Sequence, residues 1–265
     1  MAHIHALETV QRAIESFDKP VALWDRSQQA ALANLQARAS TFKIRLGQGD
    51  HSMLQEIVRL FGDIFFLESM RNLAAVESSP RLYGNLGNTI SSSQVLQNGT
   101  SAHVRIQIAN DVEGPMSSGE NVMGTILHEC VHAFISLTAC MGLCSAACER
   151  QAQDELGTKS RHGSAWQILA EATERVANDT IPGFCVKLGR TAEIETHILR
   201  EGLVLPREVM AKCFPGKKLK LEDWGASGLG LRLMRDENHG FAKGPPLGSK
   251  GTIPCSRGLI CDPPS

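Results

Sequence analysis

The fold of this chain is organised around the stretch Thr125-Ile126-Leu127-His128-Glu129-Cys130-Val131-His132-Ala133-Phe134. His128 and His132 are four residues apart, so on a helix they lie one turn apart on the same face. Apolar residues surround them, and no Pro or Gly interrupts the run from Thr125 to Met141. The stretch therefore predicts a largely buried helix that presents two imidazoles together. Ser117, followed three residues later by Glu120, predicts a capping box that opens this helix.

Two imidazoles at this spacing suit one zinc ion, and Glu129 would lie beside a water molecule held by that ion. The pattern His-Glu-x-x-His is the signature of zincin peptidases, in which the glutamate is the general base for hydrolysis. A buried helix rarely carries such a group of polar side chains without a partner for each. We therefore predict Zn²⁺ as cofactor, His128 and His132 as metal ligands, and Glu129 as the catalytic base. The competing interpretation is a core helix that carries two histidines by coincidence.

Composition excludes few classes of function. The chain has 265 residues, 42% of them hydrophobic, and a formal net charge of -1, so no global charge attracts nucleic acid or an anionic membrane. No apolar run reaches membrane-spanning length, and the N-terminal residues lack the basic and then apolar blocks of a secretory signal. We expect an intracellular protein, nuclear or cytoplasmic, without a membrane partner. Its eight cysteines are then expected to be reduced thiols rather than a disulfide framework.

The flanking sequence predicts further helices and a small sheet. Apolar residues at helical spacing predict two helices before residue 45, with a break at Lys19-Pro20. Ser52 and Gln55 predict a capping box that opens a helix toward Phe65. Short segments at 74–77, 81–84 and 102–108 predict strands, with a turn at Asn98-Gly99. Later helices are predicted over 162–178 and, as a short one, over 206–214.

The stretch from Cys140 to Arg161 shows no clear apolar period and predicts a long loop. Cys140, Cys144 and Cys148 are spaced so that a continuing helix would place them on one face. They could hold a second, structural metal or could simply pack as small apolar residues. Gly, Pro, Ser and charged residues dominate from Arg235 onward, which predicts a poorly packed tail.

A catalytic zinc site needs three protein ligands and an open position for water. The longer motif His-Glu-x-x-His-x-x-Gly-x-x-His does not apply, because Ile135 and Thr138 occupy its last two defined positions. Cys130 projects roughly 160° away from the two histidines on a helix and should not complete the site. The third ligand could be Glu171 or Glu174 on the following helix, or His162 at its start.

His128-Glu129-x-x-His132-Ala133, followed by His162-Gly163-x-x-Trp166, resembles the SprT-like zinc metalloproteases over roughly residues 52 to 180. That family includes the Spartan proteases, which degrade proteins crosslinked to DNA. In it, the histidine before the glycine is the third zinc ligand. The resemblance therefore implies that His128, His132 and His162 bind zinc and that Glu129 is the catalytic base.

Two features depart from the family pattern. The connection between His132 and His162 is longer and richer in cysteine than is usual for the family. The four-cysteine zinc ribbon that follows the protease domain in some members has no counterpart here, because the four C-terminal cysteines are scattered: Cys185, Cys213, Cys255 and Cys261.

The expected fold is α+β and zincin-like, with helices packed on a small, mostly antiparallel sheet. We expect an N-terminal helical extension (1–50), a SprT-like protease domain (51–205) and a loosely structured C-terminal extension (206–265). The expected function is a zinc-dependent endopeptidase that hydrolyses protein substrates. The resemblance further implies that the protease acts on DNA-bound proteins, with DNA as a partner, or in a stress response. The alternative is a catalytically idle, zinc-stabilised binding module.

Overall fold

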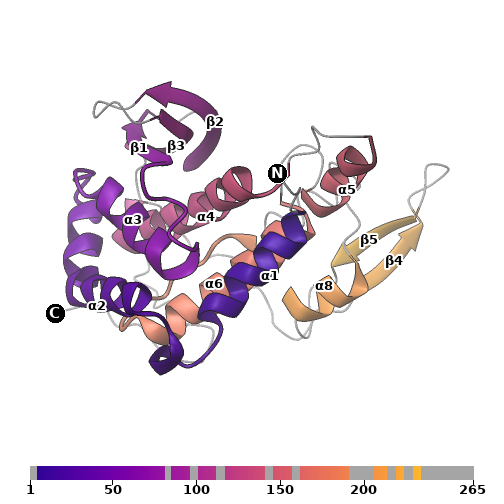
Figure 1. Ribbon diagram of the computed structural model, residues 1–265, viewed down its shortest axis with the longest axis horizontal. Helices are drawn as coiled ribbons and strands as arrows, with labels where there is room; N and C mark the ends of the chain where they lie inside the picture. Colours follow the sequence, from indigo (N-terminus) through magenta and orange to yellow (C-terminus); the bar gives the residue numbers. More distant parts are fainter. Residues whose placement is uncertain are drawn as a thin grey trace, which may run out of the picture.

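The computed structural model describes residues 5–80, 85–95, 101–111, 117–140, 146–156, 162–190, 206–213, 219–223 and 229–233 (Figure 1). The fold is α+β, as predicted. In chain order its elements are α1 (Ala6–Phe17), the short 3-10 turn η1 (Val21–Leu23), α2 (Arg26–Gly47), α3 (Leu54–Phe65), β1 (Ala74–Ser79), β2 (Gly87–Val95), β3 (Ser101–Ala109), α4 (Gly119–Thr138), α5 (Ala146–Leu156), α6 (Ser164–Thr180), α8 (Arg207–Cys213), β4 (Leu219–Asp223) and β5 (Leu229–Leu233).

The two predicted N-terminal helices are confirmed as α1 and α2. The break between them is stabilised by Trp24, whose buried indole N–H lies 3.0 Å from the carbonyl oxygens of both Phe17 and Lys19. Asp25 then caps α2, and its carboxylate and the side chain of Gln28 form a reciprocal capping box. Both helices contribute to the same hydrophobic core as α3, α4, α5, α6 and the strands β1 and β3. Phe17 of α1, for example, packs edge-on against Phe65 of α3 with ring centroids 5.3 Å apart.

The predicted capping box at Ser52 and Gln55 is wrong. Met53 is the N-cap of α3 and offers no side-chain hydrogen bond to the helix. The amide of Gln55 is bonded to β1 instead, donating to the carbonyl of Ala74 and accepting from the N–H of Val76, both at 3.1 Å. Because the Gln55 side chain bonds the strand, it does not cap the N-terminus of α3. These two hydrogen bonds instead join α3 to the sheet.

The three-stranded sheet has the order β1-β3-β2 and is mixed. β1 pairs parallel with β3 in the register Ala74↔Val104, whereas β2 pairs antiparallel with β3. The prediction of a mostly antiparallel sheet is wrong here. The central strand β3 thus has one antiparallel neighbour, β2, and one parallel neighbour, β1. The separate hairpin of β4 and β5 is antiparallel.

The strand predictions at 74–77 and 102–108 are confirmed by β1 and β3, and Val104, Ile106 and Ile108 of β3 are buried. β2 is not predicted by the sequence, because its serine-rich segment carries no apolar alternation. The predicted strand at 81–84 and the predicted turn at 98–99 lie outside the described residues.

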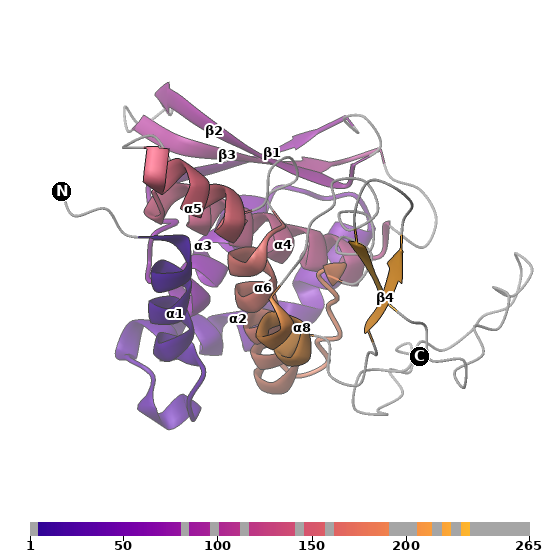
Figure 2. The same ribbon diagram turned by 90° about the vertical axis from the view of Figure 1, so that its right-hand side faces the viewer.

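Helix α4 lies at the centre of the molecule and contacts the sheet through β2 and β3, and helices α2, α3 and α6 (Figure 2). It begins one residue later than the predicted capping box requires: Ser118, not Ser117, is the N-cap, and its hydroxyl accepts from the N–H of Asn121 at 3.3 Å. The next residue is Gly119, where an added Cβ would stand 1.8 Å from the carbonyl oxygen of Lys43 in α2. A glycine here lets the two helix backbones touch.

The stretch predicted as a loop after α4 contains helix α5, so that prediction is wrong. Cys148, Ala152 and Leu156 are buried at four-residue spacing, and this single apolar stripe packs on α6. A stripe of only three residues within a polar run is too short for its period to stand out. The sulfur atoms of Cys140 and Cys148 lie 3.1 Å apart. Cys144 lies outside the described residues.

Helices α6 and α8 confirm the predicted helices at 162–178 and 206–214. Cys185, which follows α6, is disulfide-bonded, so the expectation of eight reduced cysteines is wrong at this position. Within the segment predicted to be a loose extension, the structure describes α8, β4 and β5. The predicted tail after residue 235 lies outside the described residues. Among the described helices, none has the length and apolarity needed to cross a membrane.

Candidate metal centre

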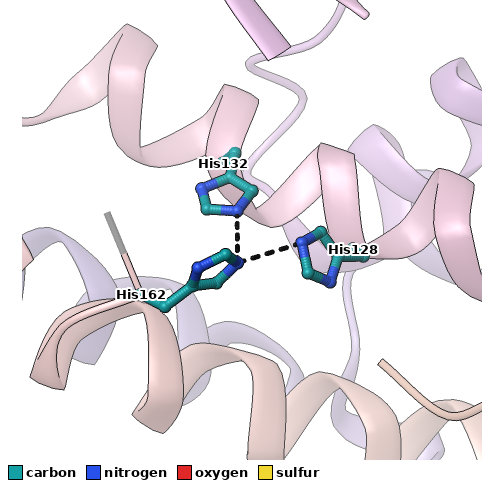
Figure 3. A group of neighbouring side chains, drawn as sticks. All are labelled: His128, His132 and His162. Atoms are coloured by element: carbon teal, nitrogen blue, oxygen red, sulfur yellow. Dashed lines mark hydrogen bonds between the residues drawn. The ribbon is translucent and has the colours of Figure 1, made fainter. Parts of the chain in front are cut away.

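The structure brings together the three predicted histidines. His128 and His132 project from α4, and His162 immediately precedes α6 (Figure 3). The Nε2 atom of His162 lies 3.0 Å from Nε2 of His132 and 3.1 Å from Nε2 of His128. One ring nitrogen from each residue falls within 4.8 Å of the others, and His162 is only 8% exposed. These three residues, here called the histidine cluster, could hold a metal ion.

A backbone carbonyl sets the orientation of His128. Its Nδ1 lies 2.8 Å from the carbonyl oxygen of Leu188. Because a carbonyl can only accept, Nδ1 carries the proton and Nε2 presents its lone pair to the cluster. Leu188 is itself held by α6, since its N–H donates to the carboxylate of Glu174 at 2.8 Å. Metal-binding histidines commonly have such a partner on the second ring nitrogen.

Trp166 lies in contact with the whole cluster. Its side chain is fully buried, and its ring centroid is 4.7 Å from that of His128, 5.5 Å from that of His132 and 4.4 Å from that of His162. Its contact with all three imidazoles could not be read from spacing alone, because it depends on how α6 packs against α4. The indole restricts the rotamers of the three rings.

Glu129 points from α4 toward β2. The hydroxyl of Thr89 donates to Glu129 Oε2 at 2.6 Å and also lies 3.1 Å from the Glu129 carbonyl oxygen. Glu129 is 5% exposed. Sequence reasoning missed Thr89, and no local signal could have found it, because β2 itself carries no strand pattern.

The alternative third ligands have other partners. Glu171 accepts from Arg175 at 3.3 Å, and Glu174 bonds Arg190 at 3.2 Å in addition to Leu188. Neither belongs to the histidine cluster. They lie seven and ten residues beyond Ser164, the first residue of α6, which is roughly 10–15 Å along a helix at 1.5 Å per residue. His162, which immediately precedes α6, is the residue that meets the two histidines of α4.

Cys130 does not join the cluster either. It is fully buried on the other side of α4, and burial raises the pKa of its thiol. A protonated, apolar-packed thiol is a poor metal ligand. This agrees with the direction in which the sequence places its side chain relative to the two histidines.

Comparison of the chain with protein-family models, with curated proteins and with solved structures finds no match. The resemblance to the SprT-like proteases therefore stays a prediction from two short motifs. What the fold adds is the position of the residues: two imidazoles from one helix, a third from just before another, and the carboxylate of Glu129 held by Thr89 of β2.

Proposed function

We propose that this chain is a zinc-dependent endopeptidase of the SprT-like type. The observation that carries the proposal is the histidine cluster with Glu129 next to His128 on the same helix. A structural zinc site would normally close its fourth position with a cysteine or a further histidine. Among the described residues, no fourth histidine, cysteine or acidic side chain joins the cluster. An open fourth position favours a hydrolytic site over a structural one.

Zinc fits the donor set. Tetrahedral zinc with Zn–N distances of about 2.0–2.1 Å separates its nitrogen ligands by roughly 3.3 Å. The two Nε2–Nε2 distances from His162, 3.0 and 3.1 Å, differ from that separation by a few tenths of an ångström, and the ligand nitrogens of His128 and His132 lie within 4.8 Å of each other. Imidazole rings can supply this adjustment by small rotations. Neutral imidazoles also leave the ion its full positive charge, which suits Lewis-acid chemistry.

Bound zinc would supply the Lewis acidity that makes a water molecule a nucleophile near neutral pH and polarises the scissile carbonyl. The chain itself supplies the proton transfers and the orientation. Glu129 would accept the proton of the attacking water and pass it to the leaving nitrogen. His128, tethered to the Leu188 carbonyl, and Trp166, packed against all three rings, would keep the imidazoles in place.

A peptide substrate would bind in an extended form along β2. This strand lies at the edge of its sheet, pairing with β3 on one side and with no other strand among the described residues. It also runs beside α4, where Thr89 contacts Glu129. Main-chain pairing to a sheet edge is a common way to hold an extended peptide with little regard for its side chains. Such a site suits an endopeptidase of broad specificity.

The proposed link to DNA-bound proteins rests on the family resemblance alone. Its test is the rate of casein cleavage with and without single- or double-stranded DNA. A rate increase that needs DNA would support recruitment to DNA-bound substrates. Equal rates across a range of salt concentrations would restrict the proposal to a DNA-independent endopeptidase.

The decisive experiment pairs metal content with casein hydrolysis in four proteins: wild type, Glu129→Gln, His162→Ala and the matched control Glu171→Gln. Wild type and control should contain one zinc ion and cleave casein. Glu129→Gln should keep zinc and lose activity by about 10²–10⁴-fold, and His162→Ala should lose both. Zinc-loaded wild type that cleaves nothing would favour the idle binding module. Wild type that binds no zinc would overturn both functions.

A further inference from the structure

The carboxylate of Glu129 is held in a site built by β2. Thr89 and Gly87 are two residues apart in this strand, so they share the face that meets α4. Thr89 donates its hydroxyl to Oε2 at 2.6 Å, at the short end of the range for a hydroxyl bonded to a carboxylate. One oxygen of the carboxylate is thereby fixed, and rotation about the last side-chain bond is restricted.

Gly87 supplies the space for this carboxylate. A Cβ at this position would lie 2.8 Å from both Cγ and Oε1 of Glu129, and 2.9 Å from the methyl carbon of Thr125. Distances below 3.0 Å are closer than side-chain carbons tolerate, so any larger residue would have to displace Glu129 or Thr125. One position of β2 therefore anchors the carboxylate, and the other makes room for it.

We propose that Thr89 is a positioning residue that orients Glu129 for proton transfer, with Gly87 providing the required space. This inference rests on the function proposed above. Glu129 and His128 are consecutive on α4, so their side chains leave the helix about 100° apart. A flexible glutamate in that position would sample many orientations that do not reach a water molecule at the histidine cluster. The hydroxyl of Thr89 restricts the carboxylate to a single orientation instead.

The two hydroxyl variants Thr89→Val and Thr89→Ser separate positioning from packing. Valine keeps the shape of threonine and removes the hydroxyl, whereas serine keeps the hydroxyl and removes the methyl group. Thr89→Val should lower kcat by about 10- to 100-fold, the usual effect of losing a hydrogen bond to a charged group or misplacing a catalytic group. KM and the content of one zinc ion should not change. Thr89→Ser should recover most of kcat.

Acetohydroxamate binding provides a readout that does not depend on hydrolysis. A hydroxamate chelates zinc, and its hydroxyl group can donate a hydrogen bond to a neighbouring carboxylate, here that of Glu129. Calorimetric titration of zinc-loaded protein should show weaker acetohydroxamate binding in Thr89→Val and near-wild-type binding in Thr89→Ser. Thr180→Val, the same substitution at the end of α6, where the hydroxyl donates to the Val176 carbonyl at 2.7 Å, is the matched control and should behave as wild type.

Gly87→Ala tests the second half of the inference. It should keep zinc and lose kcat, because the added methyl group displaces the Glu129 side chain. Wild-type kcat and hydroxamate affinity in Thr89→Val would overturn the role of Thr89, as would equal losses in the valine and serine variants. If wild type cleaves no protein but the valine variant alone weakens hydroxamate binding, the positioning of Glu129 stands and the endopeptidase function fails.

Discussion

Removing the imidazole of His162 should abolish the heat stabilisation that zinc gives this protein. His162 joins the start of α6 to α4, and its Nε2 is the atom that lies close to both other ring nitrogens. A bound ion would therefore tie two helices of the core together. The variant His162→Ala leaves two imidazoles on α4 and removes the tie.

The size of the effect follows from the number of ligands. The zinc-binding free energy of four-ligand sites in small domains is about 10–16 kcal/mol. Scaled by ligand number, a three-ligand site provides at least about 8 kcal/mol, which corresponds to a Kd for zinc near 1 μM. At roughly 100 μM free zinc this stabilises the fold by about 2.7 kcal/mol. For a chain of this size, that raises Tm by roughly 5–11 °C. Two ligands provide about 5 kcal/mol, a Kd near 0.2 mM, so the variant should shift by less than about 2 °C.

Differential scanning calorimetry with chelator and with excess zinc measures these shifts directly. The matched control is His51→Ala, because His51 contacts Ser78 and lies outside the histidine cluster. The control should show the full zinc-dependent shift of wild type. A shift of 5 °C or more in His162→Ala would refute the three-histidine site, because zinc would then stabilise the fold through other ligands.

Three further predictions test the framework around the cluster. Gly119→Ala should lower the free energy of unfolding in urea by about 3 kcal/mol, because its Cβ would stand 1.8 Å from the backbone oxygen of Lys43; unchanged stability would contradict the close approach of α2 and α4. Glu174→Ala should weaken zinc affinity roughly tenfold in a competitive chelator titration, since it releases the backbone that orients His128; unaltered affinity would show that this backbone is held by other contacts. The N–H and hydroxyl of Ser52 and the guanidinium of Arg45 lower the pKa of Asp50 from 3.8 to about 2. The Asp50 contribution is therefore complete above about pH 4 and lost as pH falls toward 2, so the stability difference between wild type and Asp50→Asn should shrink over that window.

Local periodicity predicted most of the helices. The spacing of apolar residues in α1, α2, α4 and α6 is repeated over several turns, and each helix buries the face that its spacing indicates. The same reasoning failed for α5, whose apolar stripe is only three residues long, and for β2, whose polar strand is held by its pairing with β3. An element that depends on its neighbours leaves no pattern of its own.

Predictions about helix ends were less successful for a related reason. Gln55 could serve α3 or β1, and the strand takes its amide. Ser117 and Ser118 could both cap α4. Ser118 is the residue that does so, and the following residue, Gly119, is the one against which the backbone of Lys43 packs. A polar side chain that has two available partners is assigned by packing, which a linear motif does not contain.

The sequence by itself determined that two imidazoles and a carboxylate share one helix, because a helix converts spacing into direction, and it pointed to His162 through the second motif. Only the tertiary structure decided that His162 reaches the other two rings while Glu171 and Glu174 do not, that Trp166 packs against all three, and that Thr89 holds Glu129. The physical reason is range. Ligands one turn apart are set by backbone geometry, whereas contacts such as that between Thr89 and Glu129 join residues forty positions apart and exist only once the sheet has packed on α4.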